Sequence, residues 1–330
     1  MKRILLIASV TTLAATLAWA VSVNGGAINF TDLASVATID EIYPGCEITT
    51  PGGITTITPP APGTDCNIRP DVQTATIYRL ALCTAKPDAP TAPAASVLST
   101  CSFLFTSTNS TGSAVDISLD AVTALTNGTM TKPANGTYTH LYLEIDPEIK
   151  IKTSVKFNST MADANGLTQG VYCWSKTANL FVFATNNQGS MPQATECSDT
   201  SPEASSVSTT SISYNSLMDD SQAGGTGFVN TMTNLPTTAG GPGTLDAYLI
   251  DSEGKLVETQ TLNSIGTVKR VAAILTLPNS GVVVTDATSS FVLGYNNSKG
   301  SQISTQSGAS PSRVSKFGNG PFDMTVTAAP

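Results

Sequence analysis

Short runs of alternating apolar and polar residues fill the chain after residue 70, and they limit its possible folds more than any other feature. In the run 139–145 the two leucines and Ile145 fall on one side, whereas His140, Tyr142 and Glu144 fall on the other. A period of two is typical of a β-strand with one buried face. The chain is therefore expected to be built from half-buried strands.

Turn residues separate these runs and predict hairpins. Asp146-Pro147 follows the run 139–145, and 149–157 repeats the alternation, so the two runs are expected to pair. Two further hairpins are expected, from 245–250 with 255–262 around Asp251-Ser252-Glu253-Gly254, and from 268–277 with 281–284. Other strands are expected at 73–84, 101–107, 113–119, 170–176, 179–185, 206–214 and 322–327. Short helical turns are expected only at 33–41 and 119–126.

Many short antiparallel strands with almost no helix predict an all-β fold of two antiparallel β-sandwich domains, Ig-like or jelly-roll-like. All six cysteines lie before residue 200, and a polar stretch follows the last of them. We therefore expect a disulfide-containing domain at 21–200 and a cysteine-free domain at 205–330. The rival is a single large sandwich in which this stretch is a loop.

The first twenty residues have the pattern of a secretory signal peptide. Lys2 and Arg3 precede an apolar run that is too short to cross a bilayer, and Ala18-Trp19-Ala20 offers small residues for cleavage. The mature chain is expected to begin at Val21 and to be secreted, extracellular or on the cell surface, with the periplasm as another possible compartment. No transmembrane segment is expected.

The cysteines are even in number, as expected for disulfides in an oxidising compartment. Six cysteines allow fifteen connectivities, but the spacing favours neighbours along the chain closing short loops. We expect Cys46 to pair with Cys66, Cys83 with Cys101, and Cys173 with Cys197. No Cys-x-x-Cys spacing supports a zinc or redox site.

Composition excludes several function classes. The net charge of −8 argues against nucleic acid as a partner, and a single histidine, His140, excludes histidine-based metal clusters. No Gly-x-Ser-x-Gly motif accompanies His140, so no catalytic residue, metal or cofactor is expected. The chain is predicted not to be an enzyme, although a hydrolase with an unrecognised site is a less favoured alternative.

Aromatic residues supply the favoured candidate ligand site. Tyr138, His140 and Tyr142 alternate on one run, and Tyr172 and Trp174 alternate on another. Aromatic faces can stack on sugars, so these five residues are a candidate carbohydrate-binding platform. The structural alternative is cross-strand aromatic pairing that stiffens a sheet.

The favoured function is a cell-surface or extracellular structural or adhesive protein that self-associates as a subunit of a filament or coat. The alternative is a carbohydrate-binding or other ligand-binding β-sandwich module whose partners are surface glycans. The segment Val21–Leu33 is the expected donor strand, because it precedes the first cysteine and carries the apolar residues Ala27, Ile28, Phe30 and Leu33. The alternative, slightly favoured over donation, is that this segment pairs with its own domain or stays disordered. Asn-x-Ser/Thr sequons occur at Asn29, Asn109, Asn127, Asn135, Asn158 and Asn296, and their glycosylation is left open.

Overall fold

The computed structural model describes residues 27–32, 45–49, 56–117, 122–176, 178–180, 195–208, 210–213, 231–237, 243–257, 268–277, 280–306, 309–319 and 323–330. These residues form an all-β protein without a helix, so none of them belongs to a helix that could span a membrane. The expected leader and the segment 33–41 lie outside the described residues.

The strands, in chain order, are β1 (Ala27–Asp32), β2 (Ile48–Thr49), β3 (Thr56–Ile57), β4 (Asp65–Ile68), β5 (Val72–Cys83), β6 (Cys101–Ser107), β7 (Ser113–Ile117), β8 (Val122–Ala124), β9 (Gly128–Met130), β10 (Gly136–Tyr138), β11 (His140–Ile145), β12 (Glu148–Lys152), β13 (Ser154–Ala162), β14 (Gln169–Ser175), β15 (Ala178–Leu180), β16 (Thr195–Ser198), β17 (Thr210–Ser213), β18 (Thr231–Thr237), β19 (Gly243–Ile250), β20 (Arg270–Thr276), β21 (Val282–Val284), β22 (Ser290–Asn296), β23 (Ser301–Gln306), β24 (Arg313–Asn319) and β25 (Asp323–Ala329).

The alternation predicts which side chains face the core but not which strands pair. Strands β11 and β12 do not form the expected hairpin, because both lie antiparallel to the long strand β5, one after the other. Pro147 has no N–H to donate, so the ladder with β5 is interrupted there, and Asp146 Oδ1 accepts a hydrogen bond from the Glu148 N–H. The two runs are therefore successive strands along one partner rather than the arms of a turn.

The other two expected hairpins have different outcomes. The chain does turn back at Asp251–Gly254, where Gly254 has a φ of +81° and the Val257 N–H donates to the Leu249 carbonyl. The run 281–284, in contrast, contributes β21, which pairs with β10 instead of with β20. The expected helical turn at 119–126 is also wrong in its described part, where residues 122–124 form β8.

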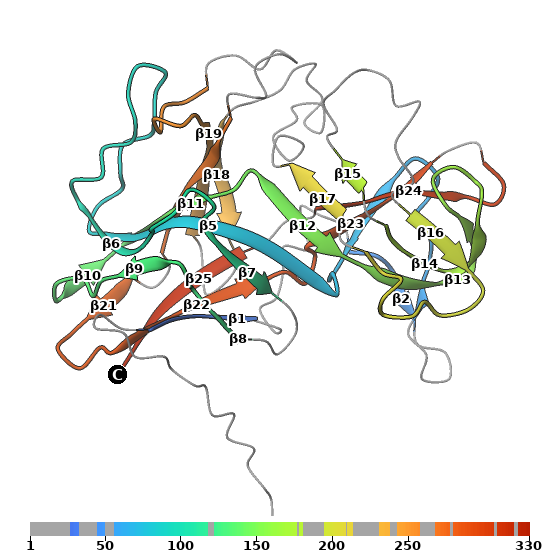
Figure 1. Cartoon of the computed structure of the whole chain (residues 1–330), viewed down its shortest axis with the longest axis horizontal. Helices are drawn as coiled ribbons and strands as arrows, with labels where there is room; N and C mark the ends of the chain where they lie inside the picture. Colours follow the sequence, from blue (N-terminus) through green and yellow to red (C-terminus); the bar gives the residue numbers. More distant parts are fainter. Residues whose placement is uncertain are drawn as a thin grey trace, which may run out of the picture.

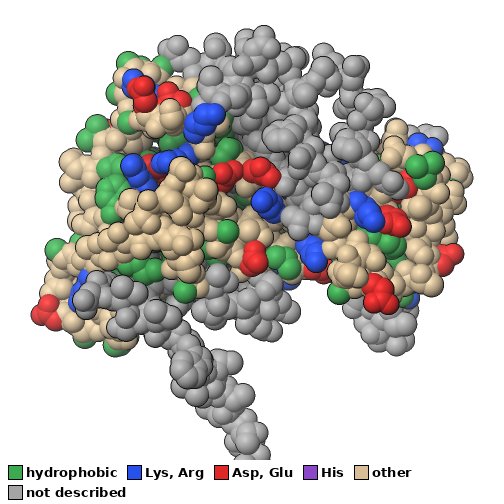
Figure 2. All heavy atoms as spheres, in the orientation of Figure 1, with side chains coloured by type: hydrophobic (Ala, Val, Ile, Leu, Met, Phe, Trp, Pro, Cys, Tyr) green, Lys and Arg blue, Asp and Glu red, His purple; other side chains and the backbone are tan. Residues whose placement is uncertain are grey.

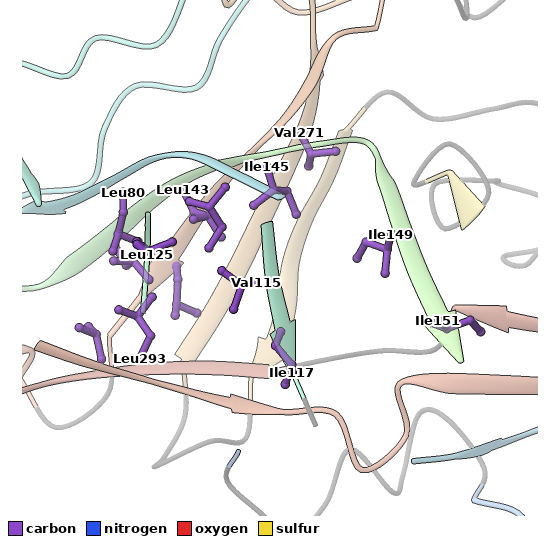
Figure 3. Packing of buried hydrophobic residues seen from close by; sticks show 14 of the residues in the cluster. Leu80, Val115, Ile117, Leu125, Leu143, Ile145, Ile149, Ile151, Val271 and Leu293 are labelled. Carbon is purple, nitrogen blue, oxygen red and sulfur yellow. The ribbon is translucent and has the colours of Figure 1, made fainter. Parts of the chain in front are cut away.

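Two sheets enclose most of the core. The large sheet has eleven strands, with β5, β11, β20 and β19 side by side in its middle. The second sheet has four strands in the order β25-β22-β1-β8 and is called the slot sheet, because β1 fills the position, or slot, between β22 and β8. Figure 1 shows β5 and β11 lying over β22, β25 and β1. Leu80 and Leu143 extend from the large sheet toward Leu293 on β22, and all three are buried (Figure 3).

An eight-stranded sheet, in which β16, β14, β13, β24, β23 and β4 are neighbours, lies to the right in Figure 1. Strands from both sides of residues 200–205 share the sheets: β11 pairs with β20, and β4 pairs with β23. In the structure, residues 201–208 lie between β16 and β17. The expected domain boundary at 200–205 remains a prediction from composition. Strands from before and after this boundary pair with each other in the same sheets.

All three predicted disulfides are confirmed: Cys46–Cys66, Cys83–Cys101 and Cys173–Cys197. The last two join residues that are register partners on adjacent strands, β5 with β6 and β14 with β16. No cysteine is free. Each bridge closes a short loop, and in the chain-entropy account such a loop stabilises the fold by about 3 kcal/mol.

Candidate functional site

The five candidate sugar-stacking residues do not form one surface. Tyr138 lies on β10 and is buried in the main core, with its hydroxyl donating to the Ala134 carbonyl. His140 and Tyr142 lie on β11, in the large sheet. Tyr172 and Trp174 lie on β14, in the eight-stranded sheet. Only His140 and Tyr172 are partly exposed.

Tyr172 and Trp174 both have structural neighbours on adjacent strands. The Lys156 ammonium lies 5.2 Å from the centre of the Tyr172 ring, from the register-paired position on β13. Trp174 is buried, and its Nε1 has no hydrogen-bond partner among the described atoms. Tyr172 and Trp174 therefore contribute to the packing of the eight-stranded sheet.

The outer face of the large sheet, which the alternation marks as polar, is covered. Tyr142 and Glu144 are 2% and 3% exposed. The proline-rich segment 84–100, closed at its base by Cys83–Cys101, lies on this face and connects to the 251–257 turn through a hydrogen bond from the Leu256 N–H to the Thr91 carbonyl. Leu98 and Leu256 pack on the apolar side chains beneath.

A charge network lies under this cover. The Glu144 carboxylate accepts hydrogen bonds from Arg270 Nη1 at 2.7 Å, Arg79 Nη1 at 3.2 Å and the Tyr142 hydroxyl at 2.9 Å. Burial is the main cause that raises the pKa of Tyr142 above its ordinary value, and the adjacent Glu144 charge adds to the effect. The three donors satisfy a carboxylate that would be costly to bury alone.

The network continues along the same face. The Arg270 guanidinium stacks over the Tyr78 ring at 4.4 Å, and the Tyr78 hydroxyl donates to Asp146 Oδ2 at 3.0 Å. Burial first and the Asp146 charge second raise the pKa of Tyr78 to about 12. This arrangement ties β5, β11 and β20 together.

A cavity of about 100 Å³ adjoins the network, lined by Arg79, Tyr142, Glu144, Arg270 and the turns at 95–98 and 250–254. Ligand sites for small molecules usually measure about 300–1,000 Å³. The cavity holds a few water molecules at most, so we assign the charged network a structural role.

His140 lies at the end of the same face. Its Nδ1 is 2.9 Å from Thr139 Oγ1, the hydroxyl of the preceding residue. Burial lowers the pKa of His140 below its ordinary 6.5, the Lys86 charge lowers it further, and the Asp246 charge opposes both. Lys86 Nζ and Asp246 Oδ2 are themselves paired at 2.6 Å. Among the described residues, no group of three or more His, Cys, Asp or Glu side chains could hold a metal ion.

A second candidate site is the position of β1 in the slot sheet. Strand β1 lies between β22 and β8, parallel to the first and antiparallel to the second. All six of its residues are register partners of β22, from Ala27 with Ser290 to Asp32 with Tyr295. Three of them, Asn29 to Thr31, also oppose β8. In the monomer the N-terminal segment therefore pairs with its own chain.

The slot is the groove in the slot sheet that β1 fills. Phe291 and Leu293 on β22 are 1% and 0% exposed, so this neighbour of β1 belongs to the main core. Within the described part of the chain, β8 pairs with no strand other than β1. Removing β1 would leave one edge of β22 open and β8 without a partner.

The described residues on either side of segment 33–44 belong to different sheets. The next described residue, Gly45, pairs with Asn67, next to the eight-stranded sheet. Figure 1 shows β1 beneath the large sheet and β2 farther to the right, near β13 and β14. The donor segment thus belongs to one sheet, and its continuation belongs to another.

Comparison with known proteins gives no guide to function, because no protein-family model, curated protein or solved structure matches this chain.

Proposed function

We propose that the chain is an extracellular structural subunit that self-associates by inserting its β1 into the slot of a neighbouring copy. The single observation that carries the proposal is the position of β1: the first described segment occupies an internal place in the slot sheet, whereas the next described residue, Gly45, pairs with Asn67 on β4 in another sheet. Three disulfides fit an extracellular, non-cytoplasmic location.

Exchange of β1 between two copies keeps the backbone hydrogen bonds that hold β1 in the slot. A neighbour's β1 in the same slot would make the same backbone ladders with β22 and β8, so the two arrangements differ little in hydrogen-bond energy. The twelve residues 33–44 can span ~40 Å when extended. This reach allows β1 to enter the slot of an adjacent molecule while the rest of its chain stays folded.

The geometry of exchange favours an open chain. Each subunit has one donor strand and one slot, and these are different surfaces, so the contact is head-to-tail. Head-to-tail contacts propagate into filaments unless the rotation between subunits closes a ring. Filament growth agrees with the low content of charge, which is 12% of the residues. On the face that Figure 2 presents, charged side chains of both signs are separated by broad areas of backbone, uncharged polar and hydrophobic side chains.

The test compares the mature chain with a chain that starts at Asp40. We expect the mature chain to form extended assemblies in electron micrographs and light scattering. The shortened chain should stay monomeric and be less stable. A synthetic peptide of residues 21–33 should restore its stability, and a scrambled peptide of the same composition should not.

The proposal fails if the two chains assemble alike, or if both remain monomeric. It also fails if the peptide and its scrambled control have the same effect, because the slot would then have no preference for the β1 sequence.

A further inference from the structure

Four of the sequons share the same surroundings. Each has an exposed asparagine and, two residues later, an exposed threonine: Asn109 with Thr111, Asn127 with Thr129, Asn135 with Thr137 and Asn158 with Thr160. The buried asparagines, Asn67 and Asn297, are followed at that position by Arg69 and Lys299, so neither is the acceptor asparagine of a sequon. At these four positions the sequon therefore coincides with an asparagine that solvent can reach.

These four sequons also lie where strand ladders begin, end or break. Asn109 is in the turn between β6 and β7, and the backbone of Thr108 bonds to the Asn127 carbonyl, so the first two sequons are adjacent. Asn127 immediately precedes β9, and Asn135 immediately precedes β10. Asn158 lies where the β13–β14 register is interrupted, between Lys156 and Met161.

We infer that Asn109, Asn127, Asn135 and Asn158 carry N-linked glycans, which shield these open ends of the sheets from unwanted pairing. The inference depends on the extracellular location in the proposed function, because the sequon is modified during export. It concerns only these four positions. Asn29 and Asn296 lie on β1 and β22, and their side chains are outside the description.

The modification is a group transfer from a lipid-linked oligosaccharide diphosphate. The asparagine Nδ2 forms a bond to the anomeric carbon of the first sugar, and the bond from that carbon to the diphosphate oxygen breaks. The lipid diphosphate leaves with the electron pair, and the proton lost from Nδ2 passes to a base of the transferase. Asn135 Nδ2 donates to Asp286 Oδ1 at 2.6 Å and Asn158 Nδ2 donates to Thr58 Oγ1 at 3.1 Å, both at exposed positions where water can replace the partner.

Glycans at these sites would fit an assembling protein. Unpaired strand edges recruit other strands unless charges, prolines or bulges block them. Among the described strands β9 pairs only with β6 and β10 only with β21, and this chain has few charges. A bulky, hydrated sugar beside β9, β10 and the break in β13 would prevent lateral pairing there. Self-association would then be directed to the slot.

The test is glycopeptide mass spectrometry of the chain purified from the cells that produce it. We expect sugar on peptides containing each of the four asparagines and none on Asn165, which is exposed but is followed at the second position by Leu167. A Leu167→Thr variant from the same cells should gain sugar at Asn165, because it creates a sequon at an exposed position.

Unmodified peptides at all four asparagines, in a chain whose disulfides are closed, would overturn the inference while leaving the proposed assembly intact. A fourfold Asn→Gln variant tests the shielding role, and we expect it to form irregular aggregates in addition to regular assemblies. If its assemblies match those of the native chain, the glycans do not shield the strand ends. Assembly without β1 would instead refute the proposed function.

Discussion

Replacing the buried carboxylate of Glu144 tests whether the covered charge network stabilises the fold. In Glu144→Gln the side chain keeps its shape but loses its charge. The carboxylate now receives two charged hydrogen bonds from Arg270 and Arg79 and a third from the Tyr142 hydroxyl. An amide offers one oxygen to these donors and turns its own N–H groups toward the others.

The size of the effect follows from burial. Removing one member of a fully buried ion pair costs about 3–5 kcal/mol. The arginine side chains are 42% and 29% exposed, so solvent screens part of the interaction. We therefore expect the free energy of unfolding of Glu144→Gln to fall by about 2 kcal/mol. Glu144→Ala should lose more, because the Tyr142 hydroxyl then also loses its acceptor.

The assay is denaturant unfolding of the oxidised chain, followed by fluorescence and circular dichroism. Glu203→Gln is the matched control, because Glu203 is exposed and its substitution should change stability by less than about 0.5 kcal/mol. If Glu144→Gln is as stable as this control, the network provides no net stabilisation, and the reasoning from its hydrogen bonds is refuted.

Two other predictions concern single positions. The one imidazole of the chain, His140, should titrate below 6.5 by nuclear magnetic resonance, and Lys86→Met should raise that pKa. As the pH falls, the imidazole is protonated in the unfolded chain before it is protonated in the folded chain, so the free energy of unfolding should fall as the pH drops from 6.5 toward the folded pKa. His140→Gln should remove this pH dependence. A folded pKa at or above 6.5 would contradict the assigned causes. Gly281→Ala should lower the unfolding free energy by about 2 kcal/mol or more, because φ is +92° and a Cβ would lie 2.0 Å from the Tyr138 carbonyl oxygen. Gly136→Ala, whose Cβ would meet nothing nearer than 4.0 Å, should cost less in the same unfolding experiment, and equal losses would refute the steric argument.

The sequence predicts well which side chains face the core, because the side on which a strand residue lies follows a local pattern. The alternation of Ile149, Ile151, Val155 and Phe157 identifies side chains that are all buried. Pairing depends instead on residues far along the chain, which a local pattern does not contain. Pro147 resembles a turn residue in the sequence, and only the presence of β5 beside both runs explains why the chain continues past it.

The candidate sites illustrate the same limit. Alternation correctly separates Tyr142 and Glu144 from the core face of β11, but it cannot indicate that 84–100 covers them. A signal was present: Cys83 and Cys101 enclose a segment with prolines at 87, 90 and 93, and that segment leaves directly from the end of β5. For the slot, the sequence predicts only the donor segment. It does not identify the acceptor strands β22 and β8, because they are far from β1 in sequence.

The central claim is that β1 fills the slot of another copy in the assembled protein, and cross-linking within isotopically mixed assemblies tests it most directly. Equal amounts of ¹⁴N and ¹⁵N chains, each with a photoreactive analogue replacing Phe30, are unfolded, refolded together and allowed to assemble. Phe30 is the register partner of Leu293 on β22, so cross-links between β1 and β22 should form. Exchange predicts that about half of these cross-links in the assembled fraction join a light peptide to a heavy one. If every cross-link joins peptides of the same isotope, β1 stays in its own chain and the account is contradicted.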